Sequence, residues 1–196
     1  MTRFTPGRGT RYAAVVAIML ISMIAGFAPA PAALPMTSAA AIPRGRVAIG
    51  DSVMLGAAEE LRARGFRRVD AVVSRQFYSA DDVLRSYRSR GRLPRIVVIG
   101  LGTNGTATLS QCHSAVAAAP RRAVFLVNNR VPRSWQASNN RVLRACAGDF
   151  GRVRLINWYR KSSGHSGWIA SDGYHLTSVG QKRYARFVDS RIDRVT

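Results

Sequence analysis

Acidic residues are scarce in this chain of 196 residues, where ten Asp and Glu stand against 30 Lys and Arg, for a formal net charge of +20. Lysine is also scarce, because Lys161 and Lys182 are the only two, so nearly all the positive charge is Arg. Such a charge favours anionic partners, such as cell-wall polymers, a membrane surface or acidic glycans. The arginines are spread over every segment without a nucleic-acid-binding motif, so we expect no nucleic-acid partner. A solvated basic surface without any partner is the simpler alternative.

Metal and cofactor motifs are missing as well. The sequence spacings around His113 and His165 match no metal-binding motif. Residues 100–105 lack the Gly-Lys-Ser/Thr ending of a phosphate-binding loop. We therefore expect neither a metal ion nor a cofactor, and we expect the protein to be a monomer.

Only one long hydrophobic run is present, over residues 13–27, and it follows a start that contains Arg3, Arg8 and Arg11. Its length of about 15 residues is less than the roughly 20 that a membrane-spanning helix needs. Small residues follow, so we predict a signal peptide over residues 1–30, with an uncleaved N-terminal anchor as the alternative. The Ala- and Pro-rich residues 31–43 are predicted to be a linker and residues 44–196 a single domain, located outside the cytoplasm or at the cell wall.

Cysteine is limited to Cys112 and Cys146, both inside the predicted domain. An even pair of cysteines in an exported chain indicates a disulfide. Each also falls in a predicted helix that flanks the same strand. Neither has an activating base nearby, which disfavours a thiol nucleophile.

The domain alternates short apolar runs with amphipathic segments. The apolar runs predict strands over residues 46–49, 69–73, 96–100, 123–127 and 153–156. The amphipathic segments predict helices over residues 53–64, 80–89, 109–118, 135–147 and 178–192, the last with capping-box spacing at Ser178 and Gln181. This alternation predicts an α/β fold of three layers, α/β/α, with a five-stranded parallel sheet. Right-handed crossovers favour the flavodoxin-like strand order 2-1-3-4-5.

Residues suited to nucleophilic catalysis follow the predicted strands. Ser52 follows the first strand at a helix start, where free backbone N–H groups favour an anion. Asn104, between two glycines, follows the third strand and has a side-chain amide that could donate to an oxyanion. Asp172 and His175, with Gly173 and Tyr174 between them, follow the fifth. The carboxyl ends of parallel strands meet at one edge, so we expect a nucleophile, Ser52, with a base, His175, oriented by Asp172.

Each of these motifs has a simpler explanation when it is taken alone. A Ser at a helix start is usually an N-cap, an Asp-x-x-His is usually a surface turn, and a Gly/Asn cluster usually ends a strand. Their joint occurrence at one predicted edge favours the catalytic interpretation.

The segments 50–52, 102–105 and 172–175, in this order, resemble the SGNH hydrolases of the GDSL esterase superfamily, and the resemblance covers residues 46–188. It implies Ser52 as nucleophile, His175 as base and Asp172 as its orienting group, with the Ser52 N–H and Asn104 as oxyanion donors. Further segments resemble the extracytoplasmic SGNH domains of bacterial acyltransferases that O-acetylate peptidoglycan and other glycans. These segments are residues 50–57, 70–71, 75–76, 101–105, 130–135, 139–140 and 157–159.

Two positions depart from the family pattern. Ser74 stands where a Gly is expected as another oxyanion donor after the second strand, and Asn157 stands where an Asp is often found. We predict Ser74 as a backbone oxyanion donor. We also predict substrate contacts from side chains at the same edge, namely Arg75, Gln76, Arg130, Trp135 and Trp158.

The resemblance implies an exported serine esterase or O-acyltransferase that acts on small acyl esters, with acetyl as the expected group, of cell-wall or other carbohydrates. The alternative is a module that keeps the fold, lacks turnover and binds anionic cell-wall polymers.

Overall fold

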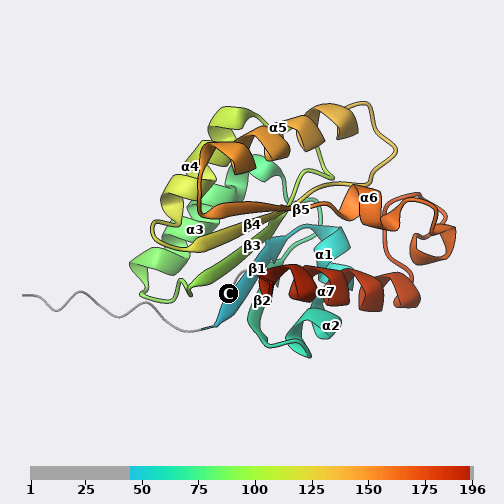
Figure 1. Ribbon diagram of the computed structural model, residues 1–196, viewed down its shortest axis with the longest axis horizontal. Coiled ribbons are helices and arrows are strands. Elements are labelled where there is room, and N and C mark those ends of the chain that lie inside the picture. The colour runs from blue at the N-terminus through green and yellow to red at the C-terminus, as the bar shows by residue number, and fades with distance from the viewer. Residues whose placement is uncertain (1–44, 195–196) are drawn as a thin grey trace, which may run out of the picture. The chain divides into compact units, whose positions relative to one another are not determined.

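The computed structural model describes residues 45–194, so the signal peptide and linker predicted over residues 1–43 lie outside the described part. Five strands form one parallel sheet in the order β2-β1-β3-β4-β5, as predicted (Figure 1). They are β1 (Arg46–Gly50), β2 (Phe66–Ala71), β3 (Ile96–Gly100), β4 (Ala123–Val127) and β5 (Val153–Ile156). The three central strands are buried along nearly their whole length, which accounts for their continuous apolar sequence.

Helices cover both faces of the sheet, so the predicted α/β/α layers are confirmed (Figure 1). One face packs on α3 (Ala80–Ser89), α4 (Leu109–Ala118) and α5 (Gln136–Asp149). The other packs on α1 (Ser52–Gly56), α2 (Ala58–Arg62), α6 (Trp158–Ser162) and α7 (Ser178–Ile192). Two short 3-10 helices, η1 (Phe77–Ser79) and η2 (Ser166–Trp168), lie in the connections.

The disulfide is present between Cys112 of α4 and Cys146 of α5, with 6.3 Å between their Cα atoms. Both cysteines are fully buried in the cluster between the sheet and these helices, so the bond ties two neighbouring helices within the core. Among the helices of residues 45–194, none combines the length and apolar content needed to cross a membrane.

Local details differ from the predictions at several places, of which three bear on the site and its supporting helices. The helix predicted over residues 53–64 is two helices, α1 and α2, because the chain turns at Ala57, whose N–H bonds back to the Met54 carbonyl. Strand β2 begins earlier and ends before Val72 and Val73, which are exposed. The side chain that caps α7 is Thr177, which accepts from the Gly180 N–H, so the predicted Ser178 capping box is wrong.

Candidate active site

Ser52 lies where β1 passes directly into α1, at the carboxyl edge of the sheet. Asp51 caps α1 by accepting a hydrogen bond from the Val53 N–H at 3.0 Å, which fixes the turn that presents Ser52. Two glycines allow this close packing. A Cβ on Gly50 would lie 2.4 Å from the Met54 side chain, and one on Gly100 would lie 2.6 Å from its methyl group. Met54 therefore fills the space directly beneath the turn.

Ser52, His175 and Asp172 form one hydrogen-bonded line. The Ser52 Oγ lies 3.0 Å from His175 Nε2, and His175 Nδ1 lies 2.6 Å from Asp172 Oδ2. The serine and the histidine are 123 residues apart in the sequence, so the fold alone brings them together. This is the geometry that a serine nucleophile, a base and an orienting carboxylate require.

The loop that carries Asp172 and His175 is held by its own backbone. Asp172 Oδ1 accepts from the N–H groups of Tyr174 at 3.1 Å and His175 at 3.0 Å. The Ala170 N–H donates to the His175 carbonyl, and Gly173 takes a φ of +85° that closes the turn. Partial burial works to raise the pKa of Asp172, but the hydrogen bonds from Tyr174 and His175 outweigh it and lower the pKa below its ordinary range. The carboxylate therefore stays ionised beside the imidazole.

Asp51 is a second carboxyl at this edge, only 1% exposed. Burial raises its pKa, and donors from Thr103 and Val53, together with the nearby His175, offset this only in part. Tyr184 of α7 lies in the core nearby, where burial and the Asp51 charge raise the pKa of its phenol. The nucleophile turn thus rests on a buried acid that is costly to ionise.

The two predicted oxyanion donors other than Ser52 lie in the loops after β3 and β2. The Asn104 side-chain amide donates to the Arg75 carbonyl at 3.3 Å, which joins the loop after β3 to the loop after β2. Ser74, at the position where the family pattern has Gly, adopts the left-handed conformation at φ +62° that favours Gly. The backbone at Ser74 therefore keeps a glycine-like shape although the residue is not Gly.

A hollow of about 320 Å³ lies beside these loops. It is lined by Ser74, Gln76, Thr103, Asn104, Val131, Arg133, Trp135 and Tyr174. The Trp135 side chain lines this hollow, but its indole N–H is buried and has no hydrogen-bond partner among the described residues. Of the predicted substrate contacts, Gln76 and Trp135 lie here. Tyr174 was missed, although its place between Asp172 and His175 could have indicated it.

The other three predicted substrate contacts lie elsewhere. Trp158 is 2% exposed and packs against Tyr184 in the core, so it has almost no surface to offer a substrate. Arg75 pairs with Asp70 at 2.8 Å, and its guanidinium therefore braces β2 against the active-site loop. Arg130 donates to the Ser162 carbonyl of α6. The structure thus gives each of these three residues a partner within the protein.

A buried asparagine supports the Asn104 loop and was not singled out as a positioning residue. Asn139 of α5 is fully buried and donates to the carbonyls of Gly102 at 2.9 Å and Gly105 at 2.8 Å. Its own carbonyl accepts from the Ala107 N–H at 2.8 Å. One side chain thus satisfies three backbone groups of the loop and fixes its shape.

Comparison with known proteins points to one family. No protein-family model matches the chain. Over 149 residues the chain is 36% identical to the peptidoglycan O-acetyltransferase OatA of Listeria monocytogenes, a match that covers 76% of this chain and 24% of that protein. The chain therefore spans about a quarter of the length of this curated relative.

Two solved structures show the same fold. The C-terminal catalytic domain of OatA from Streptococcus pneumoniae, solved with a methylsulfonyl adduct, matches with a TM-score of 0.71 and 23% identity, covering 79% of this chain and 95% of that one. A family 3 carbohydrate esterase of Clostridium thermocellum matches with a TM-score of 0.61 and 14% identity, covering 76% and 96%.

Proposed function

Because this chain belongs to the SGNH hydrolase superfamily, we propose that it is a serine-dependent enzyme that cleaves or transfers small acyl groups, with acetyl as the expected group, on carbohydrates. The observation that carries the proposal is the unbroken line from Ser52 Oγ through His175 to Asp172, at 3.0 and 2.6 Å. The similarity to a peptidoglycan O-acetyltransferase over 76% of the chain favours an acetylated cell-wall glycan as the substrate class.

The reaction begins when Ser52 Oγ attacks the ester carbonyl carbon and its proton passes to His175 Nε2. Asp172 stabilises the resulting imidazolium through Nδ1. The negative oxygen of the intermediate is held by the Ser52 N–H, the Asn104 amide and the backbone N–H of Ser74. When the carbonyl re-forms, the alcohol leaves with the proton from Nε2, and the acyl group remains on Ser52 Oγ.

The acyl-serine is then transferred to a second hydroxyl. Water or a sugar hydroxyl gives its proton to His175 and attacks the acyl carbon, which releases an acid or a new ester and restores Ser52. Hydrolysis and transfer share every protein group named here and differ only in which acceptor occupies the site. The hollow beside Asn104, with Trp135 and Arg133 among its lining residues, is the place we assign to the sugar.

An extracytoplasmic location is part of the proposal. The Cys112–Cys146 disulfide supports it, because such bonds persist in oxidising compartments. The signal peptide predicted over residues 1–30 would supply the export, with a retained anchor as the alternative.

The test is cleavage of p-nitrophenyl acetate by the purified protein and by Ser52→Ala. We expect Ser52→Ala to lose at least about 10³-fold in kcat/KM while it unfolds at the same temperature as the parent, because the nucleophile is gone. Ser110→Ala, an exposed serine at the start of α4, is the matched control and should keep full activity. Equal rates for the parent and Ser52→Ala would reject the assignment.

Product analysis with and without a chito-oligosaccharide acceptor then separates the two reactions. Acetylated sugar identifies a transferase, and free acetate alone identifies an esterase. A module without turnover is the second candidate, favoured by the strongly basic surface described below. A fluorophosphonate probe distinguishes it, because only a working nucleophile becomes labelled at Ser52.

A further inference from the structure

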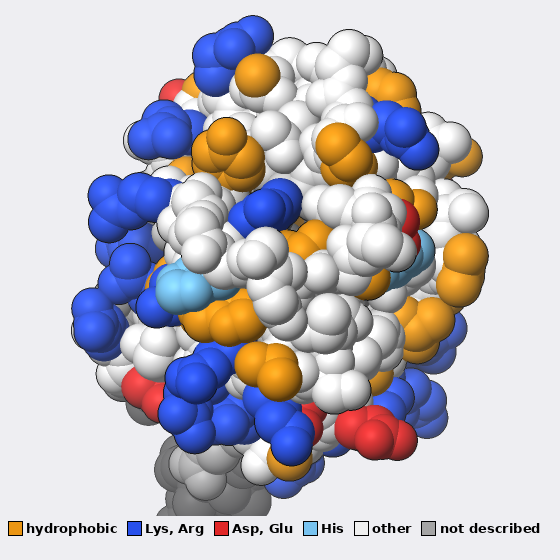
Figure 2. Space-filling model, turned by 90° about the vertical axis from the view of Figure 1, so that its right-hand side faces the viewer, with side chains coloured by type: hydrophobic (Ala, Val, Ile, Leu, Met, Phe, Trp, Pro, Cys, Tyr) orange, Lys and Arg blue, Asp and Glu red, His pale blue; other side chains and the backbone are white. Residues whose placement is uncertain are grey.

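A second hollow, larger than the one beside Asn104, lies between α6, η2 and the C-terminal half of α7. Its volume is about 460 Å³, and it shares no lining residue with the hollow beside Asn104. Six cationic side chains line it, and we call it the basic groove: Arg160, Lys161, Arg183, Arg186, Arg191 and Arg194. Figure 2, which looks onto the carboxyl edge of the sheet, shows Lys and Arg side chains around most of the rim of that face, with several of them close together at the left.

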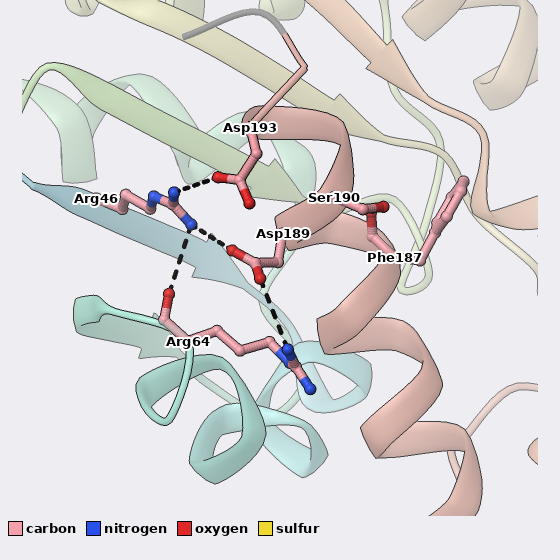
Figure 3. Close-up of polar contacts among 6 residues, drawn as sticks. All are labelled: Arg46, Arg64, Phe187, Asp189, Ser190 and Asp193. Carbon is pink, nitrogen blue, oxygen red and sulfur yellow. Dashed lines mark hydrogen bonds and ion pairs between the residues drawn. The ribbon is translucent and has the colours of Figure 1, made fainter.

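The cations of the basic groove have no acidic counterpart. No Asp or Glu lines the groove, and none of the six cations forms an ion pair with a carboxylate of residues 45–194. The acids of α7 lie on its other side. Asp189 and Asp193 both pair with Arg46 of β1, the latter at 2.6 Å, while Phe187 points away from these pairs (Figure 3). Helix α7 therefore separates its charges, with the paired acids on one side and the unpaired cations on the other.

Aromatic rings hold several of the cations without neutralising them. The Lys161 ammonium lies 5.7 Å from the ring centre of Trp168 and 5.9 Å from that of Phe187. Arg191 lies 5.2 Å above Phe187, and Arg183 lies 5.7 Å above Trp168. Cation–π contacts position a charge but leave it positive. The basic groove is thus built to keep its cations in place and available to an anion.

The groove continues beyond these residues along the sheet edge. A neighbouring hollow of about 270 Å³ shares Arg191 and Arg194 with it and adds Arg154 of β5. Along α7 the groove cations are Arg183, Arg186 and Arg191, which are roughly 4.5 and 7.5 Å apart in axial rise, and Arg194 follows just beyond the helix. An elongated series of several cations suits a linear polymer with closely spaced anions better than a single small ion.

We propose that the basic groove binds a linear polymer of short polyol units joined by phosphodiester groups. Five of its six cations are Arg, whose planar guanidinium matches phosphate oxygens in a bidentate manner. Short polyols between the phosphates keep successive negative charges close together, as the several cations along α7 require. This binding site is separate from the catalytic residues and would dock the protein on an anionic polymer whether or not Ser52 is active.

Two other polyanionic partners fit the groove less well. Trp168 already contacts the rings of His165, at 3.8 Å, and Trp158, at 6.1 Å, in addition to two cations. No open ring face is therefore left for a nucleobase to stack on, as single-stranded nucleic acid would need. A membrane surface would favour exposed apolar side chains beside the cations, but none of the exposed large hydrophobic residues of the described chain lines the groove.

The test measures binding of the purified protein to oligo(glycerol phosphate) with Arg186→Gln/Arg194→Gln. We expect at least about a 10-fold loss of affinity at 100 mM salt and a log K against log salt plot that is flatter by about 1 to 2. Arg141→Gln/Arg144→Gln is the matched control, with the same loss of charge on the exposed face of α5 across the sheet. The control should bind within about 2-fold of the parent, and both variants should keep the unfolding temperature and the p-nitrophenyl acetate rate of the parent.

Three results would overturn the proposal. Equal weakening in the control would mean that binding reflects total charge and not the basic groove. Tighter binding of a single-stranded oligonucleotide of equal charge, or of vesicles with anionic lipid, would assign the groove to a different partner. If the parent bound oligo(glycerol phosphate) no more tightly than a neutral oligosaccharide, the basic groove would not be a binding site for this polymer.

Discussion

The edge of the sheet that carries Ser52, Asp172 and His175, here called the catalytic edge, and the basic groove differ in whether their charged side chains are paired. At the catalytic edge, Asp172 is held by His175 and Arg75 by Asp70, each through a contact shorter than 3 Å. In the basic groove, six cations have no carboxylate partner among the described residues, and aromatic rings hold several of them. Chemistry requires groups fixed to within a fraction of an ångström, which paired charges provide. Attraction of a flexible polymer requires only a persistent positive field.

Of the substitutions that test this difference between the two regions, Asp172→Asn is expected to have the largest effect. An amide at position 172 cannot hold the imidazole with the proton on Nδ1 as a carboxylate does, nor stabilise the imidazolium. We expect kcat for p-nitrophenyl acetate to fall by about 10³- to 10⁴-fold. Binding of oligo(glycerol phosphate) should remain unchanged, because Asp172 is not part of the basic groove. A loss of less than 10-fold would show that Asp172 does not orient His175.

A smaller effect is expected from Asp51→Asn, and it should depend on pH. Burial raises the pKa of Asp51 in the folded protein, so the folded state loses stability as the pH rises through that pKa. The amide keeps an oxygen for the Val53 N–H but carries no charge. Asp51→Asn should therefore gain stability over the parent as the pH is raised from about 3 to 7, measured by urea unfolding at each pH. Glu59→Gln, on the exposed surface of α2, is the control. A difference that stays constant with pH would contradict the prediction.

The smallest effect is expected from Ser74→Gly, which tests strain at the catalytic edge. A non-glycine residue at φ +62° destabilises the folded state by about 1 kcal/mol. Gly removes this strain, but part of the gain is lost because Gly has more conformational freedom in the unfolded state. We expect a gain of a few tenths of a kcal/mol up to about 1 kcal/mol in the free energy of unfolding, measured by urea titration. Activity should persist, because the backbone N–H remains.

Arg121→Gly is the matched control for this substitution. Arg121 takes a similar φ of +59° in the turn before β4 and is the other non-glycine residue of the described chain at positive φ. It should give a similar gain in stability. If Ser74→Gly alone abolished activity, the Ser74 side chain would have a role beyond the backbone one proposed here.

Much of the architecture could be predicted from the sequence because the pattern was local. Strand β3 and helix α3 have the predicted ends, since continuous apolar runs and terminal Gly and Pro residues mark them. Predictions from local patterns were wrong where an adjacent residue caps the helix or where the chain turns within a predicted helix. Thr177, not Ser178, caps α7, and the turn at Ala57 divides a helix that reads as continuous. Helix α6 was missed because five residues are too few to show a period.

Trp158 is a predicted site residue whose burial the sequence pattern did not indicate. Its place among polar and aromatic residues at the predicted edge indicated a substrate contact, but the fold buries it against Tyr184. Arg75 likewise belonged to a suggestive motif, and only the structure pairs it with Asp70. A sequence gives the type and order of side chains but not which of them face inward.

By itself the sequence determined the layered α/β fold, through local patterning, and the disulfide partners, because it has only two cysteines. It also predicted Ser52, His175 and Asp172 as the catalytic residues, through motifs of fixed spacing. Tertiary structure alone decided that these three residues form one hydrogen-bonded line, that Asn139 fixes the Asn104 loop, and that the arginines of α7 gather on one side. The physical reason is that contacts across 123 residues, such as that of Ser52 with His175, depend on how helices pack on the sheet. No local stretch of the chain encodes that packing.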